Sequence, residues 1–231
     1  MPTISFVSPK GGVGKTTSAV ILATQIAQRG KPVTIIDADP NRPISHWSRL
    51  PGCPPDIRVV SEASEDTIID EIERAEHAAP FVIIDLEGTA NLTVGYAISR
   101  SDLVIIPSQG SQLDAKEAGK AIKLIQQQEK AFKRAIPYAV LLTRTSAAIK
   151  TRTLRHIQDQ LTQHGVQLFA AQLMEREAFR AIFSFGGGLE ALDRKEVSGI
   201  DAANTNARAF AAEVIDRLRR SKQPERQAEV A

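Results

Sequence analysis

Residues 9–17 read Pro9-Lys10-Gly11-Gly12-Val13-Gly14-Lys15-Thr16-Thr17, and this stretch indicates the fold of the whole chain. The apolar run before it, residues 3–8, predicts a strand, and residues 16–28 after it predict a helix. Glycines let a backbone turn tightly, so that successive N–H groups can point at phosphate oxygens. The positive end of the following helix strengthens this attraction for anions. The stretch therefore predicts a phosphate-binding loop.

Two side chains in this loop carry the expected phosphate chemistry. Lys15 is placed to reach the β- and γ-phosphates of a nucleotide, and the Thr16 hydroxyl is placed to ligate Mg²⁺. The standard pattern G-x-x-x-x-G-K-[ST] requires a glycine at position 9, where this chain has Pro9 followed by Lys10. The residues expected to contact the nucleotide in this loop are Gly11, Gly12, Val13, Gly14, Lys15, Thr16 and Thr17.

Three boxes in chain order resemble those of the ParA/MinD family of deviant Walker A ATPases, and the resemblance covers essentially the whole chain. The first box is the loop at positions 10–17. The second is Ile36-Asp37-Ala38-Asp39-Pro40-Asn41, which has Asn41 where many relatives have Gln. The third is the Walker B strand, Val82-Ile83-Ile84-Asp85. The family implies that ATP is sandwiched between two copies of the chain.

The resemblance also implies roles for individual residues. Lys10 would cross the interface and contact the phosphates of the partner's nucleotide, which makes Lys10, Lys15 and Asp39 the catalytic set. Asp39 would orient or activate the attacking water. Asp37 and Asp85 would hold the water shell of Mg²⁺. The adenine side of ATP would be flanked by Thr143, Arg144, Met174 and Arg176, and the run Gly186-Gly187-Gly188 would close over the base.

These roles agree with the chemistry of phosphoryl transfer, which depends mainly on positioning and charge stabilisation. A lysine supplied by a second subunit does the work of an arginine finger and ties hydrolysis to dimerisation. Asp37, Asp39 and Asp85 end predicted strands, where open α/β sheets bind their ligands. Turn formation before Pro40 is the alternative explanation for the first two. Glu87 is either an extra acid near the γ-phosphate or a surface turn residue.

Apolar runs alternate with helical segments along the whole chain. Residues 81–85 and 103–107 lack polar alternation, which is typical of strands buried on both faces of a parallel sheet. The alternation predicts an α/β fold, a three-layer, doubly wound, mostly parallel sheet of the P-loop NTPase type. We expect one domain over residues 1–220 and a polar, flexible tail over 221–231. The other expected strands are 32–37, 57–60, 139–143 and one within 167–173, and the other expected helices are 44–50, 65–76, 116–131, 150–163, 175–184 and 204–220.

Composition excludes several classes of protein. The 231 residues are 42% hydrophobic and 24% charged, which is ordinary for a globular chain. No apolar run approaches the roughly 18 residues that span a bilayer. One cysteine, Cys53, excludes a disulfide framework and a self-contained iron–sulfur cluster. We expect a cytoplasmic, nucleoid-associated protein with no membrane partner.

Positive charge is concentrated in one part of the chain. Residues 116–156 hold 10 basic and 2 acidic side chains, although the net charge of the whole chain is only +2. Such a stretch favours a polyanion partner, and the alternative is a solvated helix face. Contacts to phosphates bind DNA without sequence preference. The candidate residues for nonspecific DNA contacts are Lys150, Arg152 and Arg155 and, near the C-terminus, Arg217, Arg219 and Arg220.

The leading interpretation is a plasmid or chromosome partition ATPase. It would dimerise on ATP, bind DNA nonspecifically and be triggered to hydrolyse ATP by a ParB-like centromere-binding partner. A second interpretation is assistance to conjugative or T-DNA transfer together with relaxosome proteins. It arises because residues 37–47 and 175–182 resemble ParA-like proteins of Agrobacterium T-DNA transfer.

Two further interpretations belong to other functional classes. A MinD-like membrane-associated ATPase would use an apolar helical stripe near the C-terminus, although docking of that helix onto the sheet explains the stripe better. A metabolic or metal-cluster ATPase of the same superfamily is disfavoured by the single cysteine. The stripe consists of Ala207, Phe210, Ala211, Val214, Ile215 and Leu218.

Overall fold

Seven parallel strands form one sheet in the computed structural model, which describes residues 1–88, 91–147 and 151–228, the last seven of these by backbone alone. The strand order is β3-β2-β4-β1-β5-β6-β7, and every pair that is described is parallel. The predicted α/β fold with its parallel sheet is therefore confirmed. The strands are β1 (Thr3–Phe6), β2 (Val33–Ala38), β3 (Ile57–Val60), β4 (Phe81–Leu86), β5 (Leu103–Ser108), β6 (Tyr138–Thr145) and β7 (Leu173–Met174).

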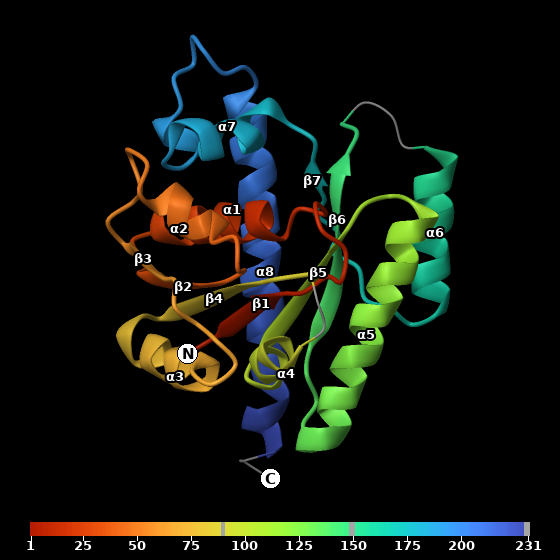
Figure 1. The fold of residues 1–231 in the computed structure, drawn as a ribbon. Coiled ribbons are helices and arrows are strands. Elements are labelled where there is room, and N and C mark those ends of the chain that lie inside the picture. Colours follow the sequence, from red (N-terminus) through yellow and green to blue (C-terminus); the bar gives the residue numbers. More distant parts are fainter. Residues whose placement is uncertain (89–90, 148–150, 229–231) are drawn as a thin grey trace.

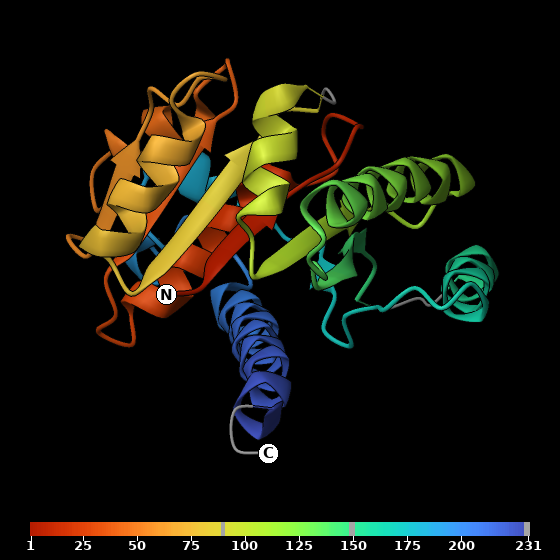
Figure 2. The ribbon, with the colours of Figure 1, turned by 90° about the horizontal axis from the view of Figure 1, so that it is seen from below.

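Helices cover both faces of the sheet, which gives the three layers that the sequence predicts (Figures 1 and 2). Seen from below, α3, α4 and α5 lie on one side of the sheet and α8 lies on the other (Figure 2). The helices are α1 (Lys15–Ala27), α2 (Pro43–Ser48), α3 (Ile68–Ala78), α4 (Leu92–Ser99), α5 (Gln112–Phe132), α6 (Arg152–Gln163), α7 (Glu177–Phe185) and α8 (Ile200–Ala228), with a short 3-10 turn at Leu189–Ala191.

Two apolar cores stabilise the layers. One lies between the sheet and α1, α2, α7 and α8, and the other lies between the sheet and α3 to α6. Strands β4 and β5 contribute to both cores, which explains why each begins with four consecutive apolar residues rather than an alternating pattern. The parallel register places Asp37 of β2 directly beside Asp85 of β4 at the carboxyl edge of the sheet.

Helix α8 confirms that the C-terminal apolar stripe docks onto the sheet. Phe210 and Val214 are fully buried, and the Phe169 ring packs edge-on against Phe210 with 5.7 Å between ring centroids. The backbone helix runs from Ile200 to Ala228, four residues earlier and eight residues later than predicted. The backbone of the predicted flexible tail is thus helical through Ala228. No helix in the described part of the chain is long and apolar enough to cross a membrane.

One helix was not predicted. α4 contains Gly95 and several β-branched and small residues, and no charged residue reveals its polar face. Its N-cap is Asn91, whose side chain accepts a hydrogen bond from the Val94 N–H. A Cβ at position 95 would lie 3.3 Å from the Gln128 amide nitrogen, so glycine here lets α4 approach α5 closely. Close packing against α5 therefore stabilises a helix that the local sequence pattern does not predict.

The last strand lies at the end of the segment in which the sequence predicts it. β7 is the pair Leu173–Met174, and earlier in the range 167–173 an isolated bridge joins Val140 and Leu168. The side chain of Asn206 on α8 holds the backbone of this segment. It accepts a hydrogen bond from the Met174 N–H at 3.0 Å and donates one to the Gln172 carbonyl at 2.6 Å. These contacts from a helix distant in sequence take the place of hydrogen bonds that a longer strand would make.

Candidate active site

The glycine-rich loop joins β1 to α1 and has the backbone shape that its sequence predicts. Gly12 and Gly14 have φ values of +72° and +97°, a region that residues with a Cβ rarely adopt. Gly14 caps α1 without a side-chain hydrogen bond, and the first turn of α1 carries no acid. The helix N-terminus therefore presents unneutralised N–H groups toward the loop, which suits an anion.

Lys15 is the buried cation of the loop. It is 7% exposed, and its Nζ donates to the Ser8 carbonyl at 3.3 Å and to the Lys10 carbonyl at 3.5 Å. Burial lowers the pKa of Lys15, and the nearby carboxylates of Asp85, Asp39 and Glu87 oppose that change. An ammonium held by two long hydrogen bonds is ready to exchange them for contacts to a phosphate oxygen.

Asp37 and Asp85 form a buried acidic pair. Ser45 at the start of α2 donates to Asp37 Oδ2 from both its N–H and its hydroxyl, each at 2.7 Å. Asp37 Oδ1 and both oxygens of Asp85 are buried and have no hydrogen-bond partner of good geometry among the described residues. Buried oxygens without partners are rare in proteins and call for a missing ligand.

Burial dominates the ionisation of this pair. It raises the pKa of Asp85 to about 7, with Asp37 and Asp39 adding repulsion and Thr16 and Lys15 opposing it. Burial also raises the pKa of Asp37, against the two hydrogen bonds from Ser45. Carboxylate oxygens that lack partners, beside the Thr16 hydroxyl, fit a hydrated Mg²⁺ ion. The residues at this position are therefore suited to the metal that the sequence predicts.

Asp39 and Glu87 line the phosphate pocket together with the loop. Asp39 Oδ1 accepts from the Asn41 N–H at 2.8 Å and from the Asn41 amide at 3.0 Å, which orients the carboxylate. Glu87 accepts from Asn91 and faces the same pocket. Of the two interpretations of Glu87, the structure favours an acid near the site of the phosphates over a surface turn residue. Glu87 is half-buried, and its negative charge raises the pKa of Lys15.

Lys10 contacts its own chain. Its Nζ lies 2.6 Å from Asp114 Oδ1 in the first turn of α5, and the Lys10 side chain is 40% exposed. The neighbouring Gln109 donates to the Gly12 carbonyl at 3.1 Å. The phosphate loop is thus tied twice to the connection between β5 and α5.

Thr143 holds the loop rather than presenting its hydroxyl to a base. It is 3% exposed, and its Oγ1 donates to the Val13 carbonyl at 2.7 Å. Its side chain also lies 3.6 Å from the position of a Cβ on Gly14. Thr143 nevertheless lines the pocket next to the loop, so the expected contact with adenine stays a prediction, to be made by atoms other than this hydroxyl.

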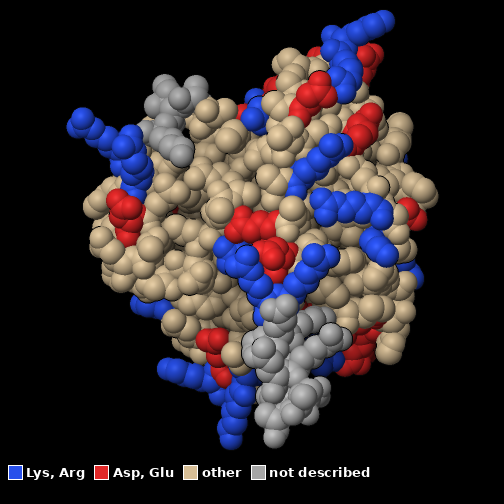
Figure 3. All heavy atoms as spheres, turned by 180° about the vertical axis from the view of Figure 1, so that it is seen from behind, with Lys and Arg blue, Asp and Glu red and all other residues tan. Residues whose placement is uncertain are grey.

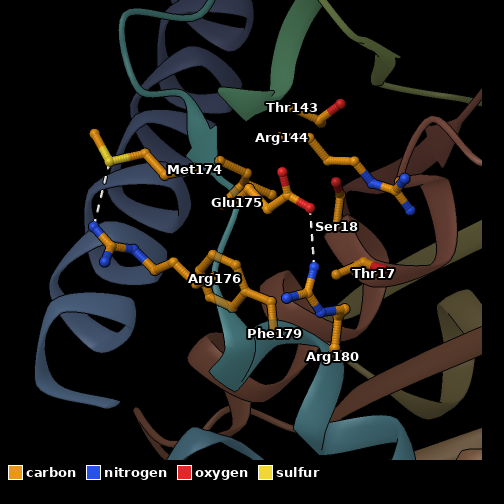
Figure 4. A pocket seen from close by; sticks show the side chains of 11 residues that line it. Thr17, Ser18, Thr143, Arg144, Met174, Glu175, Arg176, Phe179 and Arg180 are labelled. Atoms are coloured by element: carbon orange, nitrogen blue, oxygen red, sulfur yellow. Dashed lines mark hydrogen bonds and ion pairs between the residues drawn. The ribbon is translucent and has the colours of Figure 1, made fainter. Parts of the chain in front are cut away.

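A second pocket adjoins the phosphate pocket and shares Gly14, Thr17 and Arg144 with it. Ser18, Phe179 and Arg180 line it, as do residues of β7 (Figure 4). The shared residues make the two pockets one continuous cleft, which is the shape a nucleotide needs when its phosphates lie on the loop.

Met174 and Arg176 both line this pocket, and a contact of either with the base stays a prediction. The ends of both side chains turn toward α8, where Arg176 Nη2 contacts the Met174 sulfur at 3.3 Å (Figure 4). Glu175 lies between them, lines the same pocket and pairs with Arg180 at 2.9 Å. The backbone stays extended after β7, at Arg176, which is consistent with neighbouring side chains pointing to opposite sides.

The glycine run after α7 does not close over the base. Gly187 accepts a hydrogen bond from the Trp47 indole at 3.0 Å, and a Cβ on Gly186 would lie 2.2 Å from the Pro51 carbonyl. The run therefore packs against α2 and the turn that follows it. Phe179 and Arg180 of α7 line the cleft in its place.

Arg144 is confirmed as a residue of the cleft. It has a φ of +50°, and the register between β6 and β7 shifts between Thr143 and Thr145. Such a bulge re-aims one side chain, and here it directs Arg144 into both pockets (Figure 4). A guanidinium at this junction can contact either the ribose or the phosphates.

The candidate DNA contacts divide into two groups. Arg152 and Arg155 are exposed on α6, whereas Lys150 lies outside the described residues. Arg217 pairs with Glu213 at 2.9 Å, is 23% exposed and lies 4.5 Å from the centre of the Phe169 ring, so it stabilises the fold. Arg219 is exposed, and Arg220 pairs with Asp216 at 2.6 Å.

The face that carries α8 is mixed in charge. Lys and Arg side chains lie among Asp and Glu side chains over much of this face, and several Lys and Arg side chains lie together at the right of the view (Figure 3). Arg217 is thus held by contacts within the fold, and DNA contacts of the other described candidates stay a prediction.

The sequence did not indicate three residues of this region: Ser45, Asp114 and Arg180. Only Asp114 had a usable local signal, because Ser111 and Asp114 have the spacing of a helix capping pair. The contacts of the others depend on how α2 and α7 pack, which no local pattern encodes.

Comparisons with known proteins agree with this geometry. A family model described as VirC1 protein matches residues 1–220. A ParA protein of Rhizobium radiobacter is 38% identical over 218 residues, covering 94% of this chain and 98% of that protein. A VirC1 protein of the same organism is 30% identical over 187 residues, covering 79% of this chain and 80% of that protein. An McdA variant of Cyanothece in complex with ATP has the same fold, with a TM-score of 0.72 at 15% identity over 94% of this chain and 96% of that one.

Proposed function

This chain belongs to the VirC1 family of ParA/MinD-type ATPases, and on that premise we propose that it binds ATP with Mg²⁺, dimerises around the nucleotide and then binds DNA without sequence preference. Hydrolysis of ATP would end the DNA-bound state. The observation that carries the proposal is the set of buried carboxylate oxygens on Asp37 and Asp85, which have no partner among the described residues and lie beside the phosphate loop.

The chain's own residues would divide the work of hydrolysis. Loop N–H groups and Lys15 would hold the phosphates in place, and Asp37 and Asp85 would hold the water shell of the metal. Mg²⁺, when bound, would neutralise charge on the phosphate oxygens. Asp39, held by Asn41, would orient the attacking water. Lys10 would stabilise developing charge on the nucleotide of the second copy, in the manner of an arginine finger.

The biological task that we propose is partition of plasmid or chromosomal DNA with a ParB-like partner. The support is the ParA protein of Rhizobium radiobacter, which matches this chain over nearly its full length. Nonspecific DNA binding needs exposed cations and no base-reading element, and Arg152 and Arg155 on α6 supply such cations.

Assistance to DNA transfer is the second candidate function, with relaxosome proteins as partners. The specific observation in its favour is that the VirC1 family model covers residues 1–220. This candidate shares the ATP chemistry and differs in the protein partner. Binding of a purified ParB-like protein or of relaxosome proteins to the ATP-bound chain would separate the two.

The first experiment measures binding to random-sequence duplex DNA by fluorescence anisotropy with ATP, with ADP and without nucleotide. We expect the chain to bind DNA with ATP but neither with ADP nor without nucleotide. We expect Lys15→Ala to abolish DNA binding, because that variant loses its main contact to the phosphates of ATP. Equal DNA binding in all three states would contradict nucleotide control. An absence of binding in all three would contradict the DNA-partition proposal and leave the basic residues of α6 as a solvated face.

A further inference from the structure

The guanidinium of Arg176 contacts a sulfur atom rather than an oxygen. Its Nη2 lies 3.3 Å from the Met174 sulfur, and its Nε is buried without a hydrogen-bond partner among the described residues. A thioether sulfur is a weak acceptor, whereas a guanidinium carries five N–H donors. Buried donors that lack an acceptor are rare and costly. Within the part of the chain that the structure describes, this cation therefore lacks an oxygen acceptor close to the sulfur of Met174.

Met174 lies where both solvent and a nucleotide can reach it. It is half-buried and lines the pocket next to the phosphate loop. The end of its side chain meets that of Arg176 beside α8 (Figure 4). The Asn206 side chain accepts from the Met174 N–H at 3.0 Å, so the backbone that carries the sulfur is held in place. The sequence contains one other methionine, Met1, at the start of the chain.

A hydroperoxide would give this sulfur the oxygen that the cation lacks. A lone pair of the Met174 sulfur attacks one oxygen of hydrogen peroxide, the O–O bond breaks and an S–O bond forms. The departing hydroxide takes the proton of the transferred hydroxyl and leaves as water. Sulfur thus loses two electrons, and the peroxide gains them. The product is a sulfoxide, whose oxygen is a polar acceptor within reach of the Arg176 guanidinium.

We propose that Met174 is a site of reversible oxidation, and that its sulfoxide holds Arg176 away from the nucleotide. In the thioether form, the weak contact to sulfur lets the guanidinium turn toward a base bound in the same pocket. A hydrogen bond from a cation to a sulfoxide oxygen is stronger, so it keeps the guanidinium beside α8. The inference rests on the proposed binding of ATP and adds a modification that weakens it.

The first measurement is mass spectrometry after treatment with hydrogen peroxide. We expect Met174 to gain one oxygen atom under conditions that oxidise Met1, which is 57% exposed. The two methionine sulfoxide reductases, one for each sulfoxide epimer, should remove that oxygen. A Met174 that stays unmodified while Met1 is fully oxidised would overturn the proposal, as would a sulfoxide that the reductases cannot reduce.

Isothermal titration calorimetry then compares ATP binding before and after the treatment, once catalase has removed the peroxide. Oxidation should raise the dissociation constant of the wild type about tenfold, which is the effect of losing one hydrogen bond from a charged group. Reduction should restore the affinity. The matched control is Met174→Leu, which keeps Met1 and Cys53, and the treatment should not change its affinity. An unchanged affinity in the oxidised wild type, or an equal loss in the control, would overturn the proposal.

A second variant tests whether Arg176 carries the effect. Arg176→Ala should bind ATP about tenfold more weakly than the untreated wild type, because it lacks the guanidinium that the sulfoxide holds away. Oxidation of Met174 in this variant should weaken ATP binding no further. A further loss would show that the sulfoxide acts without Arg176, which would overturn the proposal.

A measurement without nucleotide separates this proposal from the proposed function. In NMR spectra of the chain with isotopically labelled arginine, the N–H protons of the Arg176 guanidinium should exchange with water about tenfold more slowly after oxidation. The spectrum of Arg176→Lys identifies the signal. Unchanged exchange would overturn the inference even in a chain that binds ATP. Slower exchange in a chain that never binds ATP would instead refute the proposed function and support the contact between the sulfoxide and Arg176.

Discussion

Thr143 ties the phosphate loop to β6 across 130 residues of sequence, through its hydrogen bond to the Val13 carbonyl. A buried hydrogen bond of this kind contributes about 1 kcal/mol, and its loss leaves a carbonyl unpaired. We therefore expect Thr143→Val, which keeps the size of the side chain, to raise the dissociation constant for ATP about fivefold. Isothermal titration calorimetry measures this directly.

Thr145 offers a matched control on the same strand. Its hydroxyl is buried and has no hydrogen-bond partner among the described residues. Thr145→Val should leave ATP affinity unchanged, because no polar contact is lost. If both variants weaken ATP equally, the affinity responds to packing of β6 in general and the role of Thr143 is wrong.

Asp85 makes the stability of the nucleotide-free chain depend on pH. Its pKa is about 7 in the folded chain, compared with 3.8 for an ordinary aspartate. Between these values the folded chain holds a proton that the unfolded chain has lost, so raising the pH destabilises the fold. The contribution over that window is roughly 4 kcal/mol.

The measurement compares denaturant unfolding of the wild type and of Asp85→Asn between pH 4 and 7, without Mg²⁺ or nucleotide. We expect the wild type to lose stability relative to the variant as the pH rises, since asparagine has no proton to release. Two curves that stay parallel across this range would show that Asp85 ionises normally.

At the residue scale, sequence predicts what depends on local spacing. The roles expected for Lys15, Thr16 and the two strand-end aspartates agree with the geometry, because their order along the loop and the strands fixes where they lie. The partner of Lys10 could not be predicted, since it depends on where α5 begins in space. The side of β7 on which each residue points could not be predicted either.

Helix α6 is the element that we expect to contact DNA. Each arginine that neutralises a DNA phosphate contributes about 0.9 to the slope of log affinity against log salt concentration. Changing Arg152 and Arg155 together to Gln should weaken DNA binding and lower that slope by about two. Anisotropy titrations at several salt concentrations give the slope, and the ATP affinity should not change.

The control removes the same charge elsewhere. Arg29 and Arg49 are exposed and lie outside α6, after α1 and α2 respectively. Changing both to Gln should leave the salt slope close to that of the wild type. If the two double variants lower the salt slope equally, DNA binding depends on the net charge of the chain and not on α6.

At the scale of elements, strands were predicted better than helix boundaries. Strands buried on both faces have a distinctive composition, whereas α4 has no charged face to mark it. Helix α5 begins four residues before the predicted start because Ser111 caps it, and those residues include Asp114. Because the predicted helix began after Asp114, the sequence did not place this carboxylate in a helix or indicate its ion pair with Lys10.

For the whole molecule, Asp39 links hydrolysis to the lifetime of the assembly. If its carboxylate orients the attacking water, Asp39→Ala should lower the hydrolysis rate about a hundredfold or more, in the range of general-base effects. The ATP-bound dimer should then persist, because nothing ends it. Size-exclusion chromatography with light scattering, in parallel with phosphate release, measures both quantities.

Asp56→Ala is the control for that variant, since Asp56 is an exposed acid in the turn before β3. It should hydrolyse ATP and dissociate at wild-type rates. Normal turnover in Asp39→Ala would show that another group orients the water, and Glu87, which lines the same pocket, would be the candidate.

Helix α2 has only six residues, yet its side chains contact both Asp37 and the segment that follows α7. Ser45 holds Asp37 at the metal end, and Trp47 holds the backbone of Gly187, just after the helix that lines the base end. Because the two contacts are two residues apart on one short helix, we expect a shift of Asp37 toward a bound metal to move Ser45 and Trp47 together, and with them the backbone at Gly187.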